Sequence, residues 1–412
     1  MTQGRAASVL NGRLGPAGAA VAIAGLAVNG LAFVVPLLGA RFLSAADLGA
    51  LAAILALGAI TTVPAQGLQL ALAVRWARAG GVPNAGRATA ATACVASGAV
   101  VLAIPLISVS LHLSPVLPLL LAATSAAVVI ASRWLGELQG QQRFVRLAVG
   151  MVLLAVARYG GVIAGLWFGA GVTGSLALGA GVAWASLPVL FALARPRGVA
   201  AGGAVAAMHI PRLRARDVAG ASGANLAMLV ISYADLILAR GLLPPTEAGA
   251  YAVGAVLTKG ALWAPQVVTV LAVPFMARGS RRALLIALAV VAGCGALLVV
   301  AAAVAGGLAV RLAGGPGYSW LAGYAPAFGG VGALYALVFV LVNAEVAAGA
   351  RWPAATLWVA VVGLAIAANL LDPPTLGGIL TLSVITATLS TATMGAVVWI
   401  TSRRSARPLP LI

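Results

Sequence analysis

ARFLSAADLGALAAILALGAITTVPAQGLQLALAVRWAR, residues Ala40 to Arg78, returns in degenerate form as ARGLLPPTEAGAYAVGAVLTKGALWAPQVVTVLAVPFMAR, residues Ala239 to Arg278. In both copies an Ala-Arg pair ends an apolar run, an acid stands two residues before a Gly, and a Pro lies inside the next apolar run. The matched positions are Asp47 and Glu247, Gly49 and Gly249, and Pro64 and Pro265.

Two further echoes keep a similar spacing. Cys94 is matched by Cys294, and the pattern Glu137-x5-Arg143 is matched by Glu345-x5-Arg351. All these matches occur in one order at offsets of 199 to 208 residues. The sequence therefore predicts a duplicated half, a sign of many transporter folds.

Composition places the chain in the membrane. Hydrophobic residues make up 62% of the chain and charged residues 8%, and the mean hydropathy is +1.10. A soluble domain with a polar surface does not reach these values. Blocks without Arg, Lys, Asp or Glu reach 45 residues, from Ala88 to Ser132, and a helix needs only about 20 residues to span the hydrocarbon. We therefore expect an all-α integral membrane protein, and we expect that block to hold two spans.

The sequence predicts twelve transmembrane helices in two sets of six, which form an N-terminal lobe (1–194), a cytoplasmic linker (195–216) and a C-terminal lobe (217–412). The first set covers roughly 17–38, 48–73, 88–110, 116–132, 147–168 and 172–194. The second set covers roughly 218–239, 248–273, 283–306, 326–346, 354–371 and 376–400.

The distribution of basic residues predicts the orientation, because Arg and Lys in short loops are retained on the cytoplasmic side. Placing both termini in the cytoplasm puts 20 of the 25 basic residues on that side. Arg41, Arg240 and Arg311 then face outward, and Arg158 and Lys259 fall within spans. This basic belt faces anionic lipid headgroups and accounts for the net charge of +18 without nucleic acid.

Because the first set of helices is even in number, the second set enters the membrane from the same side. The two lobes are thus predicted to be parallel repeats related by an axis along the membrane normal. In such an arrangement a substrate path runs between the lobes, so we expect a central cleft.

Lys259, the only Lys of the chain, lies near the middle of the eighth predicted span. An ionisable group in hydrocarbon costs at least about 2.5 to 3.5 kcal/mol and needs a partner, water or a ligand. On a helix Lys259 shares a face with Tyr251 and Gln266. One interpretation is a structural ion pair with Asp235 of the seventh span, and the other is a ligand-binding role.

Further polar groups lie within the predicted spans. These are Asn29 in the first span, Gln66 and Gln69 in the second, and Asn225 and Asp235 in the seventh. Arg158 lies at the centre of the fifth span. Its planar guanidinium suits an anionic headgroup, and the alternative is a structural Arg bonded to backbone carbonyls or water inside one lobe.

Acid and base residues also recur near the membrane surfaces. Glu137 with Arg143 and Glu345 with Arg351 are predicted to form pairs that hold cytoplasmic loops, although a substrate role is the alternative. At the outer rim, Arg41 with Asp47 and Arg240 with Glu247 form either a gate or solvated helix caps by the two acids.

Several catalytic motifs are absent from the sequence. The single Lys is followed by Gly260, which excludes a Walker A loop. His112 and His209 provide neither a zinc motif nor an acid-base pair, and two cysteines in apolar runs provide no metal cluster. We therefore expect no metal, no cofactor and no enzymatic activity.

The stretches ARFLSAADLGAL, GELQGQQRF and ARGLLPPTEAGAYAVGAVLTKGALWAP resemble the bacterial Wzx-type polysaccharide exporters of the multidrug/oligosaccharidyl-lipid/polysaccharide (MOP) flippase superfamily. The resemblance covers roughly Arg13 to Arg404. It implies a V-shaped pair of six-helix lobes, with helices 1, 2, 7 and 8 lining the cleft. It also implies that a polyprenyl-pyrophosphate-linked oligosaccharide is flipped from the cytoplasmic to the outer leaflet by alternating access.

Under this resemblance Lys259, Arg158 and Arg41 would hold the phosphates, and the amides would meet sugar hydroxyls. Expected partners are membrane lipids, the lipid-linked oligosaccharide, and polysaccharide polymerase or glycosyltransferase proteins, in a bacterial cytoplasmic membrane. The first alternative is cation-coupled multidrug extrusion within the same superfamily, which usually requires buried acids. The second is a polysaccharide ligase or membrane glycosyltransferase, for which the short outer loops are unfavourable.

Overall fold

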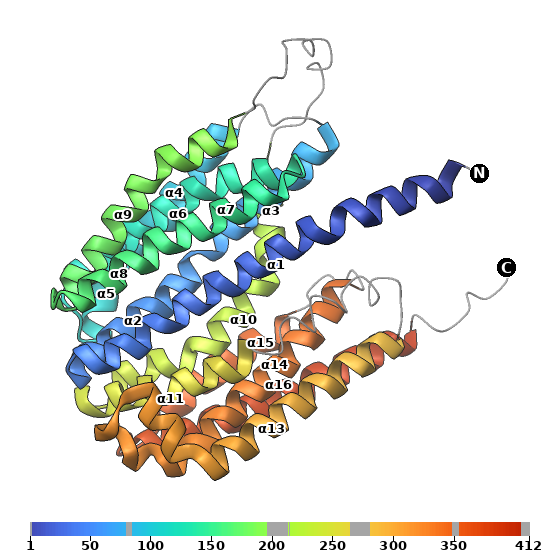
Figure 1. Cartoon of the computed structure of the whole chain (residues 1–412). Helices are drawn as coiled ribbons and strands as arrows, with labels where there is room; N and C mark the ends of the chain where they lie inside the picture. Colours follow the sequence, from blue (N-terminus) through green and yellow to red (C-terminus); the bar gives the residue numbers. More distant parts are fainter. Residues whose placement is uncertain are drawn as a thin grey trace. The chain divides into compact units, whose positions relative to one another are not determined.

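A computed structural model of the chain describes residues 2–79, 85–195, 213, 215–263, 281–347 and 354–404. In these ranges the chain is helical and contains no strand (Figure 1). The structure divides the chain into two compact units. Unit 1 comprises Met1–Leu38 and Leu57–Ser222, and unit 2 comprises Gly39–Ala56 and Gly223–Ile412.

The helices follow the predicted spans closely. Those that begin in the first half of the chain are α1 (Thr2–Phe42), α2 (Ala45–Thr61), α3 (Val63–Ala79), α4 (Ala85–Leu102), α5 (Ile104–Ser110), α6 (Val116–Gly140), α7 (Phe144–Ala155), the π-helical turn η1 (Val156–Gly160), α8 (Gly161–Trp167) and α9 (Gly171–Ala194). Those of the second half are α10 (Ala215–Leu242), α11 (Pro245–Trp263), α13 (Arg281–Gly314), the 3-10 helix η3 (Pro316–Tyr324), α14 (Ala325–Ala347), α15 (Ala355–Asn369) and α16 (Leu376–Arg404).

Within the described ranges, ten segments are long and apolar enough to cross a membrane. The shorter apolar helix α15 and the Lys-bearing helix α11 occupy the other two predicted spans. The chain is thus a multi-pass membrane protein, as predicted. The second predicted span is divided at Thr62 into α2 and α3. Pro64, the second residue of α3, has no N–H to donate to the preceding turn, which favours a break here.

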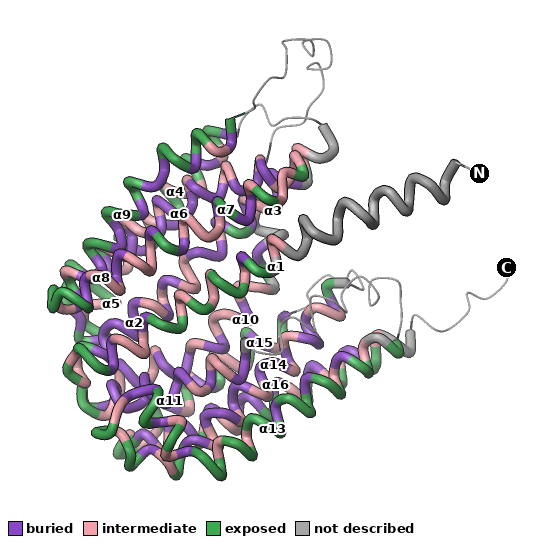
Figure 2. The backbone as a smooth tube through the Cα atoms, viewed as in Figure 1, coloured by how far each residue is buried: buried purple, intermediate pink, exposed green. Residues whose placement is uncertain are grey.

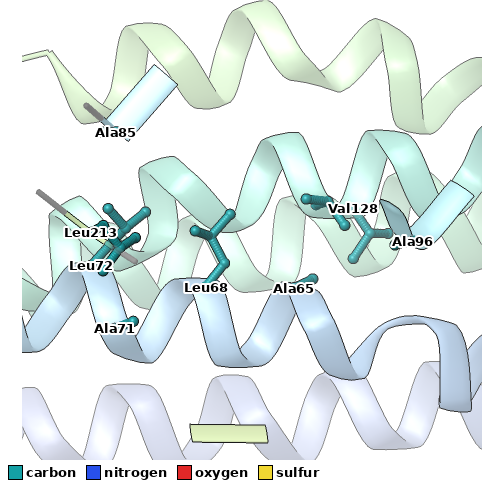
Figure 3. Close-up of a cluster of buried hydrophobic side chains, with 9 residues drawn as sticks. Ala65, Leu68, Ala71, Leu72, Ala85, Ala96, Val128 and Leu213 are labelled. Atoms are coloured by element: carbon teal, nitrogen blue, oxygen red, sulfur yellow. The ribbon is translucent and has the colours of Figure 1, made fainter. Parts of the chain in front are cut away.

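Each unit is organised around one central helix. In unit 1, α6 packs against α3, α4, α7 and α9, and in unit 2, α14 packs against α11, α13 and α16. Figure 3 shows a buried cluster of unit 1 that includes Leu68 and Leu72 of α3 and Val128 of α6. Because lipid is as apolar as these side chains, close van der Waals packing rather than the exclusion of water stabilises such layers.

Glycines allow the closest helix contacts in the unit 1 bundle. A Cβ on Gly161 of α8 would lie 2.8 Å from the Cα of Gly179 on α9, and Gly165 lies directly against Ser175. The sequence pattern Gly161, Gly165, Gly169 therefore marks close packing at its first two positions. Gly169 instead takes a φ of +70° in the turn between the two helices, a conformation that favours glycine.

Exposed apolar residues cover the outside of both units. Figure 2 shows exposed residues in green along α9 and α13. The exposed apolar side chains include Leu102 of α4 and Val304 of α13, which are both 85% exposed. Exposure of this kind suits a surface that faces lipid tails, because only apolar side chains are stable there.

Candidate functional site

A buried polar cluster lies inside unit 2 and is centred on Asp235 of α10. Asp235 is 2% exposed. Its Oδ2 accepts a hydrogen bond of 3.0 Å from the Tyr251 hydroxyl of α11. Its Oδ1 accepts a bond of 2.8 Å from the backbone N–H of Leu236. The carboxylate is therefore held by one side-chain donor and one backbone donor within the membrane.

Two further helices complete this cluster. Ser383 Oγ of α16 lies 3.4 Å from the Tyr251 hydroxyl. Tyr335 of α14 is fully buried and interacts electrostatically with Asp235, and its hydroxyl has no hydrogen-bond partner among the described residues. The sequence analysis did not select Tyr335 or Ser383. The signal that could have identified Tyr335 is its position inside an apolar run, because a buried phenol hydroxyl needs a polar partner.

Lys259 lies next to this cluster and is partly buried. Its Nζ donates to the backbone oxygen of Ser232 on α10 and lies 3.4 Å from the centroid of the Tyr233 ring. The cation–π contact and the carbonyl both stabilise an ammonium group in a region of low polarity. Lys259 and Tyr251 thus face the same neighbour, α10, as their helical spacing predicted.

Lys259 and Asp235 do not form a direct ion pair in the described part of the chain, whereas Arg133 and Glu137 do. The two charges of unit 2 interact at longer range. Each charge is instead held by its own partners on α10 and α11. The predicted ion pair between Lys259 and Asp235 is therefore absent, and each side chain has its own hydrogen-bond partners. The Lys259 ammonium group can donate further hydrogen bonds to a ligand.

Unit 1 contains a second charged position, at Arg158. This residue lies in the π-helical turn η1, in the middle of the span that α7, η1 and α8 form. Its guanidinium carbon lies 4.8 Å from the centroid of the Tyr159 ring. A Cβ on Gly58 of α2 would lie 3.1 Å from its Nη2. The guanidinium therefore packs on a glycine surface, and π-helical turns of this kind are frequent at functional sites.

A pair of hydroxyl groups joins α2 to α6 near Gly58. One turn along α2 from Gly58, Thr61 Oγ1 lies 2.9 Å from Ser125 Oγ of α6. Among the described residues Arg158 itself has no hydrogen bond and no ion pair. No backbone carbonyl among the described residues accepts from Arg158, and its role as a binding or a structural residue stays a prediction.

The remaining polar residues of the predicted site are dispersed. Gln69 of α3 donates to Gln139 of α6 at 3.0 Å, which joins two helices of unit 1. Asn29 and Asn225 are partly buried, and Gln66 is exposed. Gln266 lies outside the described residues. Gln69 thus links α3 to α6.

The rim acids are arranged differently from the predicted pairs. Ser44 accepts a hydrogen bond of 3.2 Å from the backbone N–H of Asp47 and donates one of 2.9 Å to its carboxylate. Ser44 therefore caps the start of α2, whereas the sequence predicted a cap by the acid itself. Arg240 donates to the backbone oxygen of Ala46 at 3.1 Å and interacts with Asp47. Arg41 is exposed.

The predicted cytoplasmic pair of unit 1 is also corrected. Glu137 pairs with Arg133 one turn earlier on α6, at 3.1 Å. Arg143 instead donates to the backbone oxygen of Arg195 at 3.5 Å. A contact at i and i+4 on one helix needs no loop closure, so it forms more readily than the predicted contact across a turn. In unit 2 Glu345 accepts a bond of 2.7 Å from Thr401, and Arg351 lies outside the described residues.

No protein-family model matches this chain, and no curated protein matches it in sequence. Solved structures do match it. An inward-facing multidrug resistance MATE family transporter of the MOP superfamily is 13% identical with a TM-score of 0.65, over 92% of this chain and 96% of that chain. The lipid II flippase MurJ, in an inward closed conformation, is 10% identical with a TM-score of 0.65, over 91% of this chain and 86% of that chain.

A MOP superfamily transporter from Pyrococcus furiosus, described by a reverse polarity of its binding pocket, is 12% identical with a TM-score of 0.53. It is matched over 93% of this chain and 95% of that chain. At these identities the comparisons establish architecture. The chain therefore has the all-helical fold that these MATE and MOP superfamily transporters share with the lipid II flippase MurJ.

Proposed function

We propose that the protein is a MOP-type membrane transporter that flips a polyprenyl-pyrophosphate-linked oligosaccharide to the outer leaflet by alternating access. The observation that carries the proposal is the guanidinium of Arg158, which lies inside a membrane span and has no ion pair or hydrogen bond among the described residues. A charged donor fork in hydrocarbon is costly, and a phosphate would satisfy it with two parallel hydrogen bonds.

Lys259 supports the same substrate class. It is a second basic group inside a membrane-spanning helix, and its backbone and ring contacts leave part of the ammonium group for an anion. Two bases in the spans suit a pyrophosphate, while the polyprenyl tail remains in lipid. The amides Gln66, Gln69, Asn225 and Gln266, and less directly Asn29, would meet sugar hydroxyls.

The proposal is tested by deleting the gene and extracting the lipids. Polyprenyl-linked oligosaccharide should accumulate on the cytoplasmic side and be cleared when the wild-type chain is restored. Normal lipid profiles in the deletion strain would refute the proposed substrate. In the same strain Lys259→Ala should abolish export without lowering the amount of protein in the membrane.

Arg158 is tested with two substitutions. Arg158→Gln removes the charge, and Arg158→Lys keeps the charge but removes the planar fork, so both should lower export, the first more than the second. Arg311→Gln is the control, because Arg311 is an exposed Arg at the end of α13. Full export by Arg158→Gln, at wild-type protein level, would remove Arg158 from the proposal.

Cation-coupled multidrug extrusion is the second candidate, and buried Asp235 is the observation that favours it. Its carboxylate lies in the membrane beside the unsatisfied hydroxyl of Tyr335, and exchange of a cation requires such an acid. If this candidate is correct, expression in a drug-sensitive strain should raise resistance to tetraphenylphosphonium, and Asp235→Asn should abolish the effect.

A further inference from the structure

An open pocket lies at the end of unit 2 where α10 leads into α11. It has a volume of about 390 Å³ and is lined by Ala45, Thr246, Glu247, Ala250, Gly317, Tyr318 and Trp320. This size is within the range of ligand sites, about 300 to 1,000 Å³. The predicted orientation places this end of unit 2 outside the cell.

The polar groups of the pocket are free to bind a ligand. Glu247 lies in the first turn of α11 and has no hydrogen-bond or ion-pair partner among the described residues. It therefore offers two acceptor oxygens without giving up an internal contact. Thr246 beside it is exposed and can both donate and accept.

The aromatic wall of the pocket is supported from behind. Trp320 is 54% exposed, yet its ring packs edge-on against Tyr324, with ring centroids 6.5 Å apart and planes at 87°. A Cβ on Gly314 would lie 2.8 Å from Tyr318 Cδ2, so this ring packs closely on α13. Both rings are thus held on a packed base, with much of the indole left uncovered.

The opposite wall is also fixed. The backbone of Ala45 lies directly against Gly249, where a Cβ would clash with it. Arg240, which is 7% exposed, binds the neighbouring carbonyl of Ala46 at 3.1 Å. These contacts position the start of α2 against α11, so the pocket is formed without a ligand.

We propose that this pocket, formed by Trp320, Tyr318, Glu247 and Thr246, is a carbohydrate-binding site. A sugar ring presents an apolar C–H face that can stack on an exposed indole, and its hydroxyls can donate to a carboxylate. The pocket combines both features on adjacent walls. Identifying the bound sugar as the glycan of an exported lipid-linked substrate rests on the proposed function, whereas binding of free sugar does not.

The test uses the full chain in nanodiscs made of phosphatidylglycerol and phosphatidylethanolamine. Saturation-transfer NMR is recorded with glucose, galactose, rhamnose and N-acetylglucosamine at millimolar concentrations. At least one sugar should receive saturation above that seen with empty nanodiscs. Trp320→Ala should weaken that binding about five- to tenfold, through loss of the stacking surface.

Glu247→Gln keeps the size of the side chain and should weaken binding severalfold, and thermal melting checks that each variant remains folded. Trp358→Ala is the matched control, because Trp358 is an exposed Trp on α15, away from the pocket. Its sugar binding should equal that of the wild type.

Three results would overturn the proposal. One is the absence of saturation transfer to every sugar, and another is unchanged binding in folded Trp320→Ala. The third is binding of tetramethylammonium alone, which would make the pocket an aromatic cation site. The two proposals fail separately. If the deletion strain has a normal lipid profile but the purified chain binds a sugar, the flippase proposal is refuted and the carbohydrate site is retained.

Discussion

Among single residues, Tyr251 and Asp235 form the best-defined polar contact of the membrane-spanning region. Both are buried, and their hydrogen bond joins α10 to α11. Tyr251 also packs edge-on against Phe328 of α14, with ring centroids 5.1 Å apart. One side chain therefore connects the charged cluster to the central helix of unit 2.

We expect Tyr251→Phe to destabilise unit 2, because Asp235 loses its side-chain donor while the ring packing is retained. The loss of such a buried partner costs about 1 to 3 kcal/mol. For a unit of this size, each kcal/mol lowers the melting temperature by about 2 to 4 °C, which fluorescence-monitored melting in detergent can measure. Tyr324→Phe, a partly exposed Tyr of the same unit, should melt like the wild type.

A double-mutant cycle with Asp235→Asn separates this bond from other effects. If the contact is present, the two substitutions should be non-additive by more than about 0.5 kcal/mol. Additive changes in melting would show that the hydroxyl and the carboxylate do not interact.

At the scale of elements, the contact between α8 and α9 depends on a missing side chain. We expect Gly161→Leu to prevent this contact, because a Cβ there already lies 2.8 Å from the backbone of Gly179, and overpacking cannot be relieved by moving a flexible side chain. Gly181→Leu on α9 is the control, since a Cβ at Gly181 meets no atom within 4 Å. Size-exclusion chromatography in detergent should show loss of folded protein for the first variant and not for the second.

The sequence predicted such elements well, although it did not predict their interruptions. Apolar length sets the number of spans, and charged residues set their ends. The break at Thr62 adjoins Pro64, a local signal that the sequence carries, whereas local periodicity does not indicate the π-helical turn at Arg158.

For the whole molecule, the basic belt predicts that both termini and the loop after α6 are cytoplasmic. In a chain with Cys94 and Cys294 replaced by Ala, a single His112→Cys should react with a membrane-impermeant maleimide in intact cells. A single Gln142→Cys in the same background should react only after permeabilisation. His112 and Gln142 are both exposed residues of unit 1. The reverse labelling pattern would invert the topology and place the sugar pocket in the cytoplasm.

The amino-acid sequence by itself determined that this chain crosses the membrane many times and roughly where the described spans lie, and it predicts that its halves repeat. The reason is that charged side chains and unpaired backbone groups are costly in hydrocarbon, so long apolar segments without charges indicate helices that span the membrane. Tertiary structure alone decided the partners of the polar residues. Glu137 pairs with Arg133, Ser44 caps the start of α2, and Tyr335 interacts electrostatically with Asp235. Some of these contacts depend on how distant helices pack, and others on local caps and on the rotamers of single side chains. Hydropathy reports neither.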